Sequence, residues 1–458
     1  MLQTAPAPAC SCRPSIAAKP WLSRALRPHR SAHGTRRHRV RYRLVPPPRR
    51  LQIGASQRIS TLTSPRPSQR GEVLVRARNL KMARSAHAYV RGNTLKFYSW
   101  LEASGKILPK GPSIWICGDC HLGNLGPLAD HRGGVEIQIR DLDQTVIGNP
   151  AHDLIRLGLS LASAARGSDL PGVTTARMLE ALMEGYEAAL NLDPDDAQGH
   201  PPIIGEVLKE AIGRTWAQLA QDRLNHADPS IPIGKRFWTV SRAERRAIEA
   251  MCATDQVRDL VTRLKGRKSA ADIRFLDVAY WMKGCSSLGR LRFAVLLAID
   301  RKTGKGADIC FLDIKEAVTA AAPRDREAVM PRDNAERIVA GARAMSPNLG
   351  ERMVASRLLG KAVVVRELAP QDLKVEIKRL NQTEAMAVAR SLAGVVGRAH
   401  ARQMTAATRA AWLNELARNR SGALDAPSWL WTSVVELIAT HEGAYLEHCR
   451  RYARSLGA

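Results

Sequence analysis

The sequence lacks the features that mark membrane-spanning and disulfide-stabilised proteins. No uninterrupted apolar stretch approaches the roughly 18 residues that a transmembrane helix needs, so we expect no membrane segment. Eight cysteines are scattered over 458 residues, which gives no disulfide framework and predicts a protein of the reducing cytoplasm. We also find no internal repeat of fixed period.

Acidic residues are missing from the N-terminal segment Met1–Gly71. This segment contains 15 Lys and Arg and no Asp or Glu, which leaves +12 of the net charge of +27 for the rest of the chain. It is rich in Pro and Ser, so we expect it to be disordered. It resembles an organelle transit peptide, a basic arm that binds nucleic acid, or an extension without function that follows from a start codon placed too far upstream. We favour the third interpretation. No apolar segment follows the twin arginines Arg36–Arg37, so export is not expected.

The remaining chain is long enough for two or three domains, and a hydrophobic content of 45% is ordinary for a soluble globular protein. Alternating and short apolar runs predict strands at Ser113–Cys117, Val135–Ile139, Leu291–Ile299, Asp308–Ile314 and Ala362–Leu368. Helical spacing predicts helices at Lys81–Trp100 (with a possible break at Arg91–Asn93), Asp153–Ala165, Thr174–Leu190, Ile204–Leu224, Ser241–Leu264, Asp333–Met345, Thr383–Gln403 and Pro427–Arg454. The strands are therefore concentrated between Tyr280 and Leu368.

The most informative stretch runs from Cys117 to Asp153. It contains CGDCHLGN and then IRDLDQTVIGNPAHDL, so that Asp119 is followed by Asn124 and, at the end of a β-like run, by Asp141. This pattern is typical of Mg-dependent phosphoryl transfer, in which one carboxylate orients the acceptor hydroxyl while an Asn and an Asp bind the metal on the nucleotide phosphates. We expect Asp119 to be the base and Asn124 and Asp141 to be metal ligands. His121 is expected to bond the loop backbone.

A second constellation combines a Gly-rich loop with a lysine. The loop Gly284–Gly289 (GCSSLG) is expected between a helical segment and a strand, and Ser286 occupies the place of a middle glycine, next to Ser287. Such loops let backbone amides approach phosphate groups. Loop, strand, turn, strand and then Lys315 is the order in which a nucleotide lobe presents a lysine to phosphates. On the following helix Glu336 could pair with this lysine, and its rivals for that role are Glu316 and Glu327.

The same loop contains C-x-x-C-H at Cys117, Cys120 and His121. By itself this pattern also matches covalent c-type haem attachment, a redox pair or half of a zinc site. Haem attachment generally requires an exported chain, and no signal peptide is visible. No second ligand pair at zinc spacing appears either. We therefore favour the phosphotransfer interpretation of the loop.

Cys117–Asp153 resembles the catalytic core of aminoglycoside and choline kinase-like phosphotransferases, whose pattern is HGDxHxxN, then I-D-[FW]-[DE], then G-D-P-x-x-D-L. Here the corresponding segments are CGDCHLGN, IRDLD and GNPAHDL, with Cys117 in place of the usual first His. The resemblance implies a catalytic role for Asp119, a second acidic position at Asp143 beside the metal ligands, and a structural role for Asp153.

The wider chain, from about Lys81 to Arg402, resembles the bacterial family called domain of unknown function 2252. The segments that carry this resemblance include KMARSAHAYVRGN, WICGDCHLGNLG, GCSSLGRLRFAVLL, DIKEA and GRAHARQ. In kinase-like proteins the Gly-rich lobe precedes the catalytic loop, whereas here Asp119 precedes both Gly284 and Lys315. The two resemblances together imply a circularly permuted kinase-like fold, which close chain termini make possible.

We therefore expect an α+β, two-lobed protein-kinase-like fold with permuted order. The expected divisions are a disordered basic extension at 1–71, a helical catalytic lobe at 72–270, a β-rich nucleotide-binding lobe at 271–375 and C-terminal helices at 376–458 that pack on the catalytic lobe. The expected function is Mg-ATP-dependent phosphoryl transfer to a small hydroxylated acceptor. Two alternatives remain, a nucleotide-binding regulator with weak or no turnover and a basic protein that binds nucleic acid through its N-terminal segment.

Overall fold

The structure is a computed structural model that describes residues 64–105, 108–192, 199–215, 218, 230–264, 267, 269–284, 288–300, 307–372, 381–418 and 426–454. Most of the segment expected to be an extension, residues 1–63, lies outside this part of the chain. The first elements are a 3₁₀ helix at Pro67–Gln69 and α1 at Arg70–Met82, so regular structure begins slightly before residue 72. Helices and strands are mixed along the chain, which gives an α+β fold.

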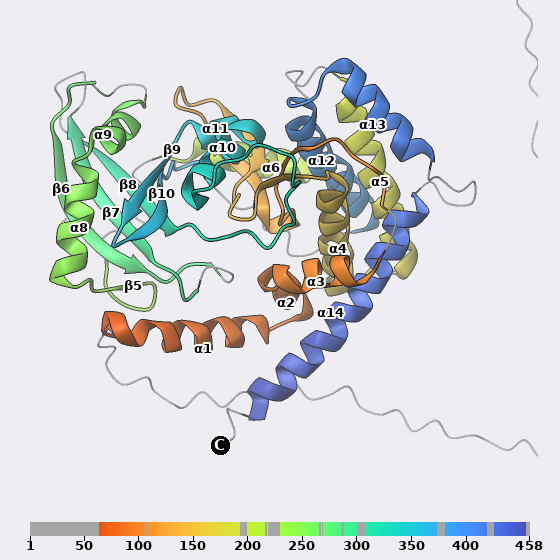
Figure 1. The fold of residues 1–458 in the computed structure, drawn as a ribbon, viewed down its shortest axis with the longest axis horizontal. Helices are drawn as coiled ribbons and strands as arrows, with labels where there is room; N and C mark the ends of the chain where they lie inside the picture. The colour runs from red at the N-terminus through yellow and green to blue at the C-terminus, as the bar shows by residue number, and fades with distance from the viewer. Residues whose placement is uncertain are drawn as a thin grey trace, which may run out of the picture. The chain divides into compact units, whose positions relative to one another are not determined.

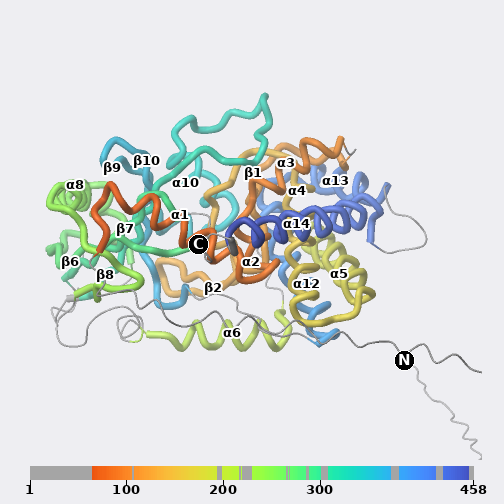
Figure 2. The backbone as a smooth tube through the Cα atoms, turned by 90° about the horizontal axis from the view of Figure 1, so that it is seen from below, coloured from red at the N-terminus to blue at the C-terminus, as the bar shows by residue number. Residues whose placement is uncertain are grey.

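One region is built from long helices that are distant in sequence. It contains α2 (Ala86–Gly92), α3 (Thr94–Ala103), α4 (Ala151–Gly167), α5 (Gly172–Asn191), α6 (Pro202–Gly213), α12 (Gln382–Ala401), α13 (Ala406–Arg418) and α14 (Ser428–Arg454). Figure 1 shows α4 and α5 beside α12, α13 and α14, and α6 is clearest in Figure 2. Because α4 carries apolar side chains almost all round, it is buried in this core. The C-terminal helices therefore pack on the helices of the first half of the chain.

The second region is a six-stranded antiparallel sheet with the order β5-β6-β7-β8-β10-β9. Its strands are β5 (Phe237–Trp238), β6 (Ile273–Trp281), β7 (Arg292–Asp300), β8 (Ala307–Glu316), β9 (Met353–Leu358) and β10 (Lys361–Glu367). The central strand β7 is buried from Arg292 to Ile299, because both faces of the sheet are covered. Figure 1 shows the sheet and the helical region as separate parts of the fold, with α10 (Asn334–Met345) and α11 (Pro347–Gly350) between them.

One face of the sheet packs against α1, α8 (Arg242–Cys252) and α9 (Asp255–Thr262). Leu74 of α1 belongs to this core, and the buried Arg70 forms an ion pair of 2.6 Å with Glu244 of α8. The sequence placed these three helices in the helical lobe that was expected to extend to residue 270. Their packing instead joins them to the sheet. The opposite face of the sheet turns toward the helical region and carries the polar side chains described below.

Several sequence expectations agree with the structure and others need correction. The predicted strand Val135–Ile139 matches β3 in its bounds, and the break predicted at Arg91–Asn93 separates α2 from α3. The segment before Gly284 is strand β6 and not a helix, because its aromatic and β-branched residues pair with β7. Ser241–Leu264 is two helices, because α8 ends at Cys252 and α9 begins at Asp255. Part of the helix expected at Ile204–Leu224 lies outside the described residues. Among the described residues no helix is both long and apolar enough to cross a membrane.

Candidate functional site

The loop Cys117–Asn124 follows strand β1 (Ile114–Ile116) and ends in a short 3₁₀ turn that leads into β2 (Leu125–Ala129). Gly118 has φ +73°, and a Cβ at this position would lie 2.1 Å from the carbonyl oxygen of Gln144. Only glycine fits such a close approach of two backbones at positive φ. The structure therefore requires the glycine of the CGD motif and brings the loop against the segment that carries the other motif.

Three polar residues on one face of α4 fix this loop. Asp153 accepts hydrogen bonds from the backbone N–H groups of Cys117 (2.7 Å) and Gly118 (2.9 Å). Ser160 Oγ accepts from the backbone N–H of Leu122 at 3.1 Å. The third residue of the face is Arg156. Asp153 and Ser160 are seven residues apart, so about two turns of helix span the loop. The structural role expected for Asp153 is therefore visible in its hydrogen bonds.

A chain of buried hydrogen bonds extends from Asp153 into the helical core. His400 Nε2 of α12 lies 3.2 Å from an Asp153 oxygen, and its Nδ1 lies 2.9 Å from the hydroxyl of Tyr186 of α5. Trp412 Nε1 donates to that hydroxyl at 3.0 Å. Since buried polar networks are rigid when every member is satisfied, this network fixes Asp153 and through it the loop. His400 thus lies beside Asp153, which binds the loop at Cys117. Cys117 occupies the position where the motif usually has a histidine.

Asn124 lies at the end of the loop and is buried. Its amide nitrogen donates to the backbone carbonyls of Asp141 at 2.6 Å and Asp119 at 3.3 Å. These bonds fix the side chain and leave Oδ1 as its ligand atom. An amide oxygen is a suitable ligand for a hard divalent cation.

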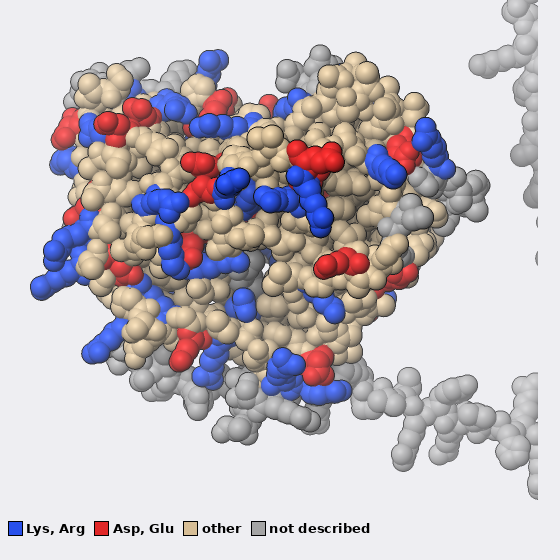
Figure 3. Space-filling view, in the orientation of Figure 1, with Lys and Arg blue, Asp and Glu red and all other residues tan. Residues whose placement is uncertain are grey.

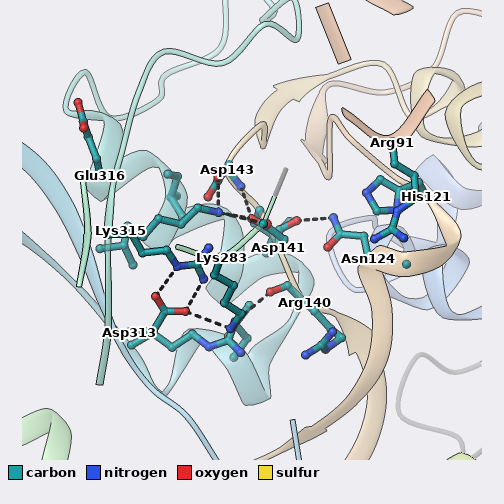
Figure 4. Close-up of a pocket in the computed structure, with 18 of the residues that line it drawn as sticks. Arg91, His121, Asn124, Arg140, Asp141, Asp143, Lys283, Asp313, Lys315 and Glu316 are labelled. Carbon is teal, nitrogen blue, oxygen red and sulfur yellow. Dashed lines mark hydrogen bonds and ion pairs between the residues drawn. The ribbon is translucent and has the colours of Figure 1, made fainter. Parts of the chain in front are cut away.

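Asp141 and Asp143 follow strand β3 (Val135–Ile139), which pairs with β2 and so places them beside Asn124. Both carboxylates contact Lys315 of β8. Lys315 Nζ lies 3.1 Å from each Asp141 oxygen and forms a second ion pair with Asp143. Figure 4 shows the lysine between the two carboxylates, with Asn124 on the far side of Asp141. Four residues of two separate motifs thus converge on one place.

The shared lysine separates the pKa values of the two carboxyl groups. Burial raises the pKa of Asp141, but the Lys315 ammonium outweighs burial and the net pKa lies well below its usual range. Burial and the neighbouring Asp141 charge raise the pKa of Asp143 to about 6. The Asp141 side chain is 48% exposed whereas that of Asp143 is 16% exposed. A pair with one exposed, firmly ionised carboxylate is suited to bind a cation.

Lys315 belongs to a row of charged side chains on one face of β8. Side chains alternate along a strand, so Asp313 and Lys315 face the helical region while Leu312 and Ile314 enter the core beneath α8 and α9. Arg292, opposite Lys315 on β7, binds Asp313 through Nε at 2.8 Å and Nη2 at 2.5 Å. Burial raises the pKa of Asp313, but the Arg292 guanidinium brings it well below its usual range.

The Gly-rich loop is only partly within the described residues. Ser286 and Ser287 lie outside them, whereas Gly284 and Gly289 are described and both take positive φ, at 89° and 100°. Lys81 Nζ of α1 donates to the carbonyl of Gly284 at 2.7 Å. Gly284 lines the same cavity as Lys315. The structure therefore brings the start of this loop to the site.

Glu336 does not pair with Lys315 among the described side chains. It is exposed in the first turn of α10, where its backbone N–H donates to Asp333. Its rival Glu316 binds Lys361 and the backbone N–H of Leu291, at 2.8 and 2.7 Å. The carboxylates of Asp141 and Asp143 occupy the place that a helix glutamate was expected to take.

Asp119, the expected base, is paired with a buried arginine. Arg156 of α4 lies 2.9 Å from Asp119 Oδ1 through Nε and also through Nη2. The Asp119 side chain is 13% exposed and is not among the residues that line the cavity. Burial raises the pKa of Asp119 in spite of the guanidinium beside it. His121 lies between this carboxylate and the cavity, with Nε2 at 3.9 Å from Asp119 Oδ2.

The sequence did not single out two residues that organise the site. Arg156 could have been found, because Asp153, Arg156 and Ser160 are polar residues at helical spacing in an otherwise apolar helix. Arg337 of α10 is buried, and it donates to the carbonyls of Asp143, Thr145 and Val318. Carbonyl acceptors leave no trace in a sequence, so no pattern predicts this second arginine.

Cys117, Cys120 and Asp153 offer ligand atoms that all lie within 4.8 Å of one another, and all three are buried. However, both oxygens of Asp153 already accept backbone hydrogen bonds. Burial raises the pKa of the Cys117 thiol well above its usual range. With both Asp153 oxygens engaged by the loop backbone, Cys117 and Cys120 are side chains packed in the hydrophobic core.

Asn124, Asp141, Asp143 and Lys315 line a cavity of about 410 Å³ between the sheet and the helical region. That volume lies within the roughly 300–1,000 Å³ of typical small-molecule sites. Asp141, Asp143 and Asn124 supply oxygen atoms, which is the ligand chemistry that Mg²⁺ prefers, and Lys315 supplies a cation. The residues present thus fit a metal-bound phosphate group.

No curated protein and no solved structure matches this chain. A family model does match, over residues 70–451, which is most of the chain and includes every site residue named above. The chain therefore belongs to the family described as "Uncharacterized protein conserved in bacteria (DUF2252)".

Proposed function

We propose that this protein is a Mg-ATP-dependent phosphotransferase that acts on a small hydroxylated acceptor, with a circularly permuted kinase-like fold. The observation that carries the proposal is the contact of Lys315 with Asp141 and Asp143 in a cavity that Asn124 also lines. A lysine on a strand and two or three oxygen ligands from a loop and a strand end are the parts that phosphoryl transfer requires.

The order of elements in the sheet supports the same proposal. Strand β6 is followed by the glycines Gly284 and Gly289 and then by β7, β8 with Lys315 comes next, and α10 follows. This is the order of Gly-rich loop, lysine strand and helix in kinases. The loop Cys117–Asn124 precedes all of these elements in the chain, which is why the proposed fold is permuted.

The chemical step needs little from the protein beyond positioning and charge. The acceptor hydroxyl oxygen forms a bond to the γ-phosphorus, the bond from that phosphorus to the bridging oxygen breaks, and ADP leaves with the electron pair. The hydroxyl proton passes to Asp119, with His121 between this carboxylate and the cavity. Lys315 would contact the phosphates, the Gly284–Gly289 loop would cover them, and Asn124, Asp141 and Asp143 would hold Mg²⁺. When bound, Mg²⁺ neutralises phosphate charge.

The proposal is tested by calorimetric titration of Mg-ATP into the full chain and into two variants, Asp141→Ala and Lys315→Ala. We expect the parent to bind and both variants to bind at least about tenfold more weakly, because one removes a metal ligand and the other a phosphate contact. The matched control Asp259→Asn changes an exposed aspartate of α9 and should bind like the parent. A folded parent that binds no Mg-ATP would contradict the proposal.

One observation favours a second candidate, a nucleotide-binding regulator without turnover. The Arg156–Asp119 pair withdraws the expected base from the cavity wall. A parent that binds Mg-ATP but forms no ADP, alone or with a panel of hydroxylated acceptors, would favour this candidate. The nucleic-acid alternative rests on the N-terminal segment, most of which lies outside the described residues. On the face seen in Figure 3 the described basic side chains are interspersed with acidic ones.

A further inference from the structure

The cavity carries more positive than negative side chains. Its lining includes seven lysines and arginines but only four aspartates and glutamates. The charges are also divided in space. Figure 4 shows Lys315, Lys283 and Asp313 together on the sheet side, whereas Arg91 and Arg140 lie on the side of His121 and Asn124. In the proposed function the sheet side takes the nucleotide, so the second group of cations lies on the side of the acceptor.

Arg91 is built into the catalytic loop. The guanidinium of this α2 residue packs directly on Gly123, since a Cβ at that position would meet Arg91 Nη2 at 2.6 Å and Cζ at 2.7 Å. Any larger residue at 123 would displace the arginine. The glycine that precedes the metal ligand Asn124 therefore makes room for a positive charge beside the loop.

Arg140 is fixed from the other side. It directly precedes Asp141, and its backbone N–H donates to the carbonyl of Asn124 at 2.8 Å. Its Nη2 donates to the carbonyl of Asp372 at 3.0 Å, and Arg366 Nη1 donates to the carbonyl of Arg140 at 3.0 Å. Hydrogen bonds thus fix both the backbone and the guanidinium group of Arg140, and the residue lines the cavity.

His121 lies beside Arg91, and one of its ring nitrogens lacks a hydrogen-bond partner among the described residues. His121 is 8% exposed, lines the cavity, and its Nδ1 is buried without a partner. Burial and the nearby Arg156 and Arg91 charges lower its pKa well below the usual range, so the ring is neutral. The neutral ring adds no charge to the site, so on this side of the cavity the positive charge comes from arginines such as Arg91 and Arg140.

We infer that the acceptor carries an oxyanion group, a phosphate or a carboxylate, which binds to Arg91 and Arg140 on the side of the cavity where His121 lies. This inference rests on the proposed function, because it assigns the sheet side of the cavity to the nucleotide. Guanidinium groups suit oxyanions because they donate parallel hydrogen bonds in a fixed plane. The acceptor is then a small molecule with both a hydroxyl group and a negatively charged group.

The test uses the full chain saturated with Mg²⁺ and a non-hydrolysable ATP analogue. Inorganic phosphate and, separately, malonate are titrated into this complex by calorimetry, so that the two arms distinguish phosphate from carboxylate. We expect one of them to bind while the analogue stays bound. Arg91→Gln and Arg140→Gln should each weaken that binding about tenfold and change the affinity for the analogue less than threefold.

Two further variants keep the result interpretable. Arg91→Lys retains the charge and should bind the oxyanion more tightly than Arg91→Gln, with thermal unfolding used to confirm that both are folded. Arg357→Gln changes an arginine that is 72% exposed and paired with Asp333, and it should leave both affinities unchanged.

Displacement of the oxyanion by the ATP analogue would overturn the inference, because Arg91 and Arg140 would then serve the nucleotide phosphates, and the proposed function would stand. Binding of neither probe to the nucleotide complex would also overturn it. Oxyanion binding that depends on both arginines in a protein that binds no nucleotide would instead support the oxyanion site and contradict the proposed function.

Discussion

Asp119 and Asp141 are expected to act together, yet the structure places them in opposite settings. Asp119 is 13% exposed and pairs with Arg156, a residue of the same helical region. Asp141 is 48% exposed and pairs with Lys315, a residue of the sheet. The first pair stabilises one region by itself, whereas the second joins the two regions across the cavity. The Asp119 side chain is therefore held within the helical region, while the proposed cation site depends on how the sheet meets that region.

The largest expected effect concerns the buried pair. Arg156→Met leaves the Asp119 carboxylate buried without its partner, which should lower the free energy of unfolding by about 3–5 kcal/mol. The double variant Asp119→Asn, Arg156→Met removes both charges and should recover a large part of that loss. Urea unfolding of the parent, both single variants and the double variant measures the coupling. Additive losses in this cycle would mean that the pair does not act as a unit.

The next effect concerns the exposed carboxylate. Asp141→Asn removes the charge of a proposed metal ligand, and we expect the affinity for Mg-ATP to fall about 100-fold, which corresponds to about 2.7 kcal/mol. Its effect on the free energy of unfolding should stay below about 1 kcal/mol, because the group is half exposed. Calorimetry and urea unfolding are compared with the control Asp259→Asn. A loss of stability as large as that of Arg156→Met would show that the half-exposed Asp141 stabilises the fold as much as the buried Asp119–Arg156 pair does.

A third carboxylate, Asp372, should make the free energy of unfolding depend on pH. Burial raises its pKa, but the guanidinium groups of Arg352 and Arg366 outweigh burial and bring it to about 2. In the unfolded chain the pKa is about 3.9, so between these values the unfolded state binds more protons and stability rises with pH. The ion pairs of Asp372 with Arg352 and Arg366 therefore contribute about 2 kcal/mol to the free energy of unfolding above pH about 4, and this contribution is lost as pH falls toward about 2.

The measurement is urea unfolding of the parent and of Asp372→Asn at pH 5, 4 and 3. The deficit of the variant should be largest at pH 5 and smaller at pH 3. A deficit of equal size at all three pH values would show that the carboxylate charge is not its cause.

Lys315→Met should have a smaller effect on stability than Arg156→Met. Its partner Asp141 reaches solvent, and its more buried partner Asp143 has a pKa of about 6 and so takes up a proton readily. The loss in the free energy of unfolding should therefore be about 1 kcal/mol, whereas the affinity for Mg-ATP should fall about tenfold. A lysine that matters more for stability than for nucleotide binding would be a structural bridge and not a phosphate ligand. Unfolding and calorimetry on the same preparation decide between the two.

The smallest effect is expected at Glu336. Because Lys315 binds Asp141 and Asp143 and Glu336 is exposed on α10, Glu336→Gln should change the affinity for Mg-ATP less than twofold. A tenfold loss in the same calorimetric titration would indicate a nucleotide-bound state in which this glutamate approaches the lysine.

The sequence predicted those parts of the site that lie close together in the chain. Asp119, Asn124 and Asp141 form a pattern with fixed spacing, and the structure brings the last two together with Lys315. Strand β6 was not predicted, because its pairing with β7 depends on a partner strand and not on its own pattern. Nor was Arg337, whose acceptors are backbone carbonyls on two other segments. Glu336 was selected by its position on the helix, and the structure shows that position to be exposed.

The close packing of α5 against α12 has a consequence for the time course of synthesis. Tyr186 meets His400 in the core, but the chain between these helices must be made first. At about 5–20 residues per second, the ribosome needs roughly 10–40 seconds to pass from the end of α5 to the start of α12. During that interval the apolar faces of α4 and α5 have no final partner, and Asp153 waits for its histidine. The nascent protein is therefore most in need of chaperones after α5 has been made and before α12 appears.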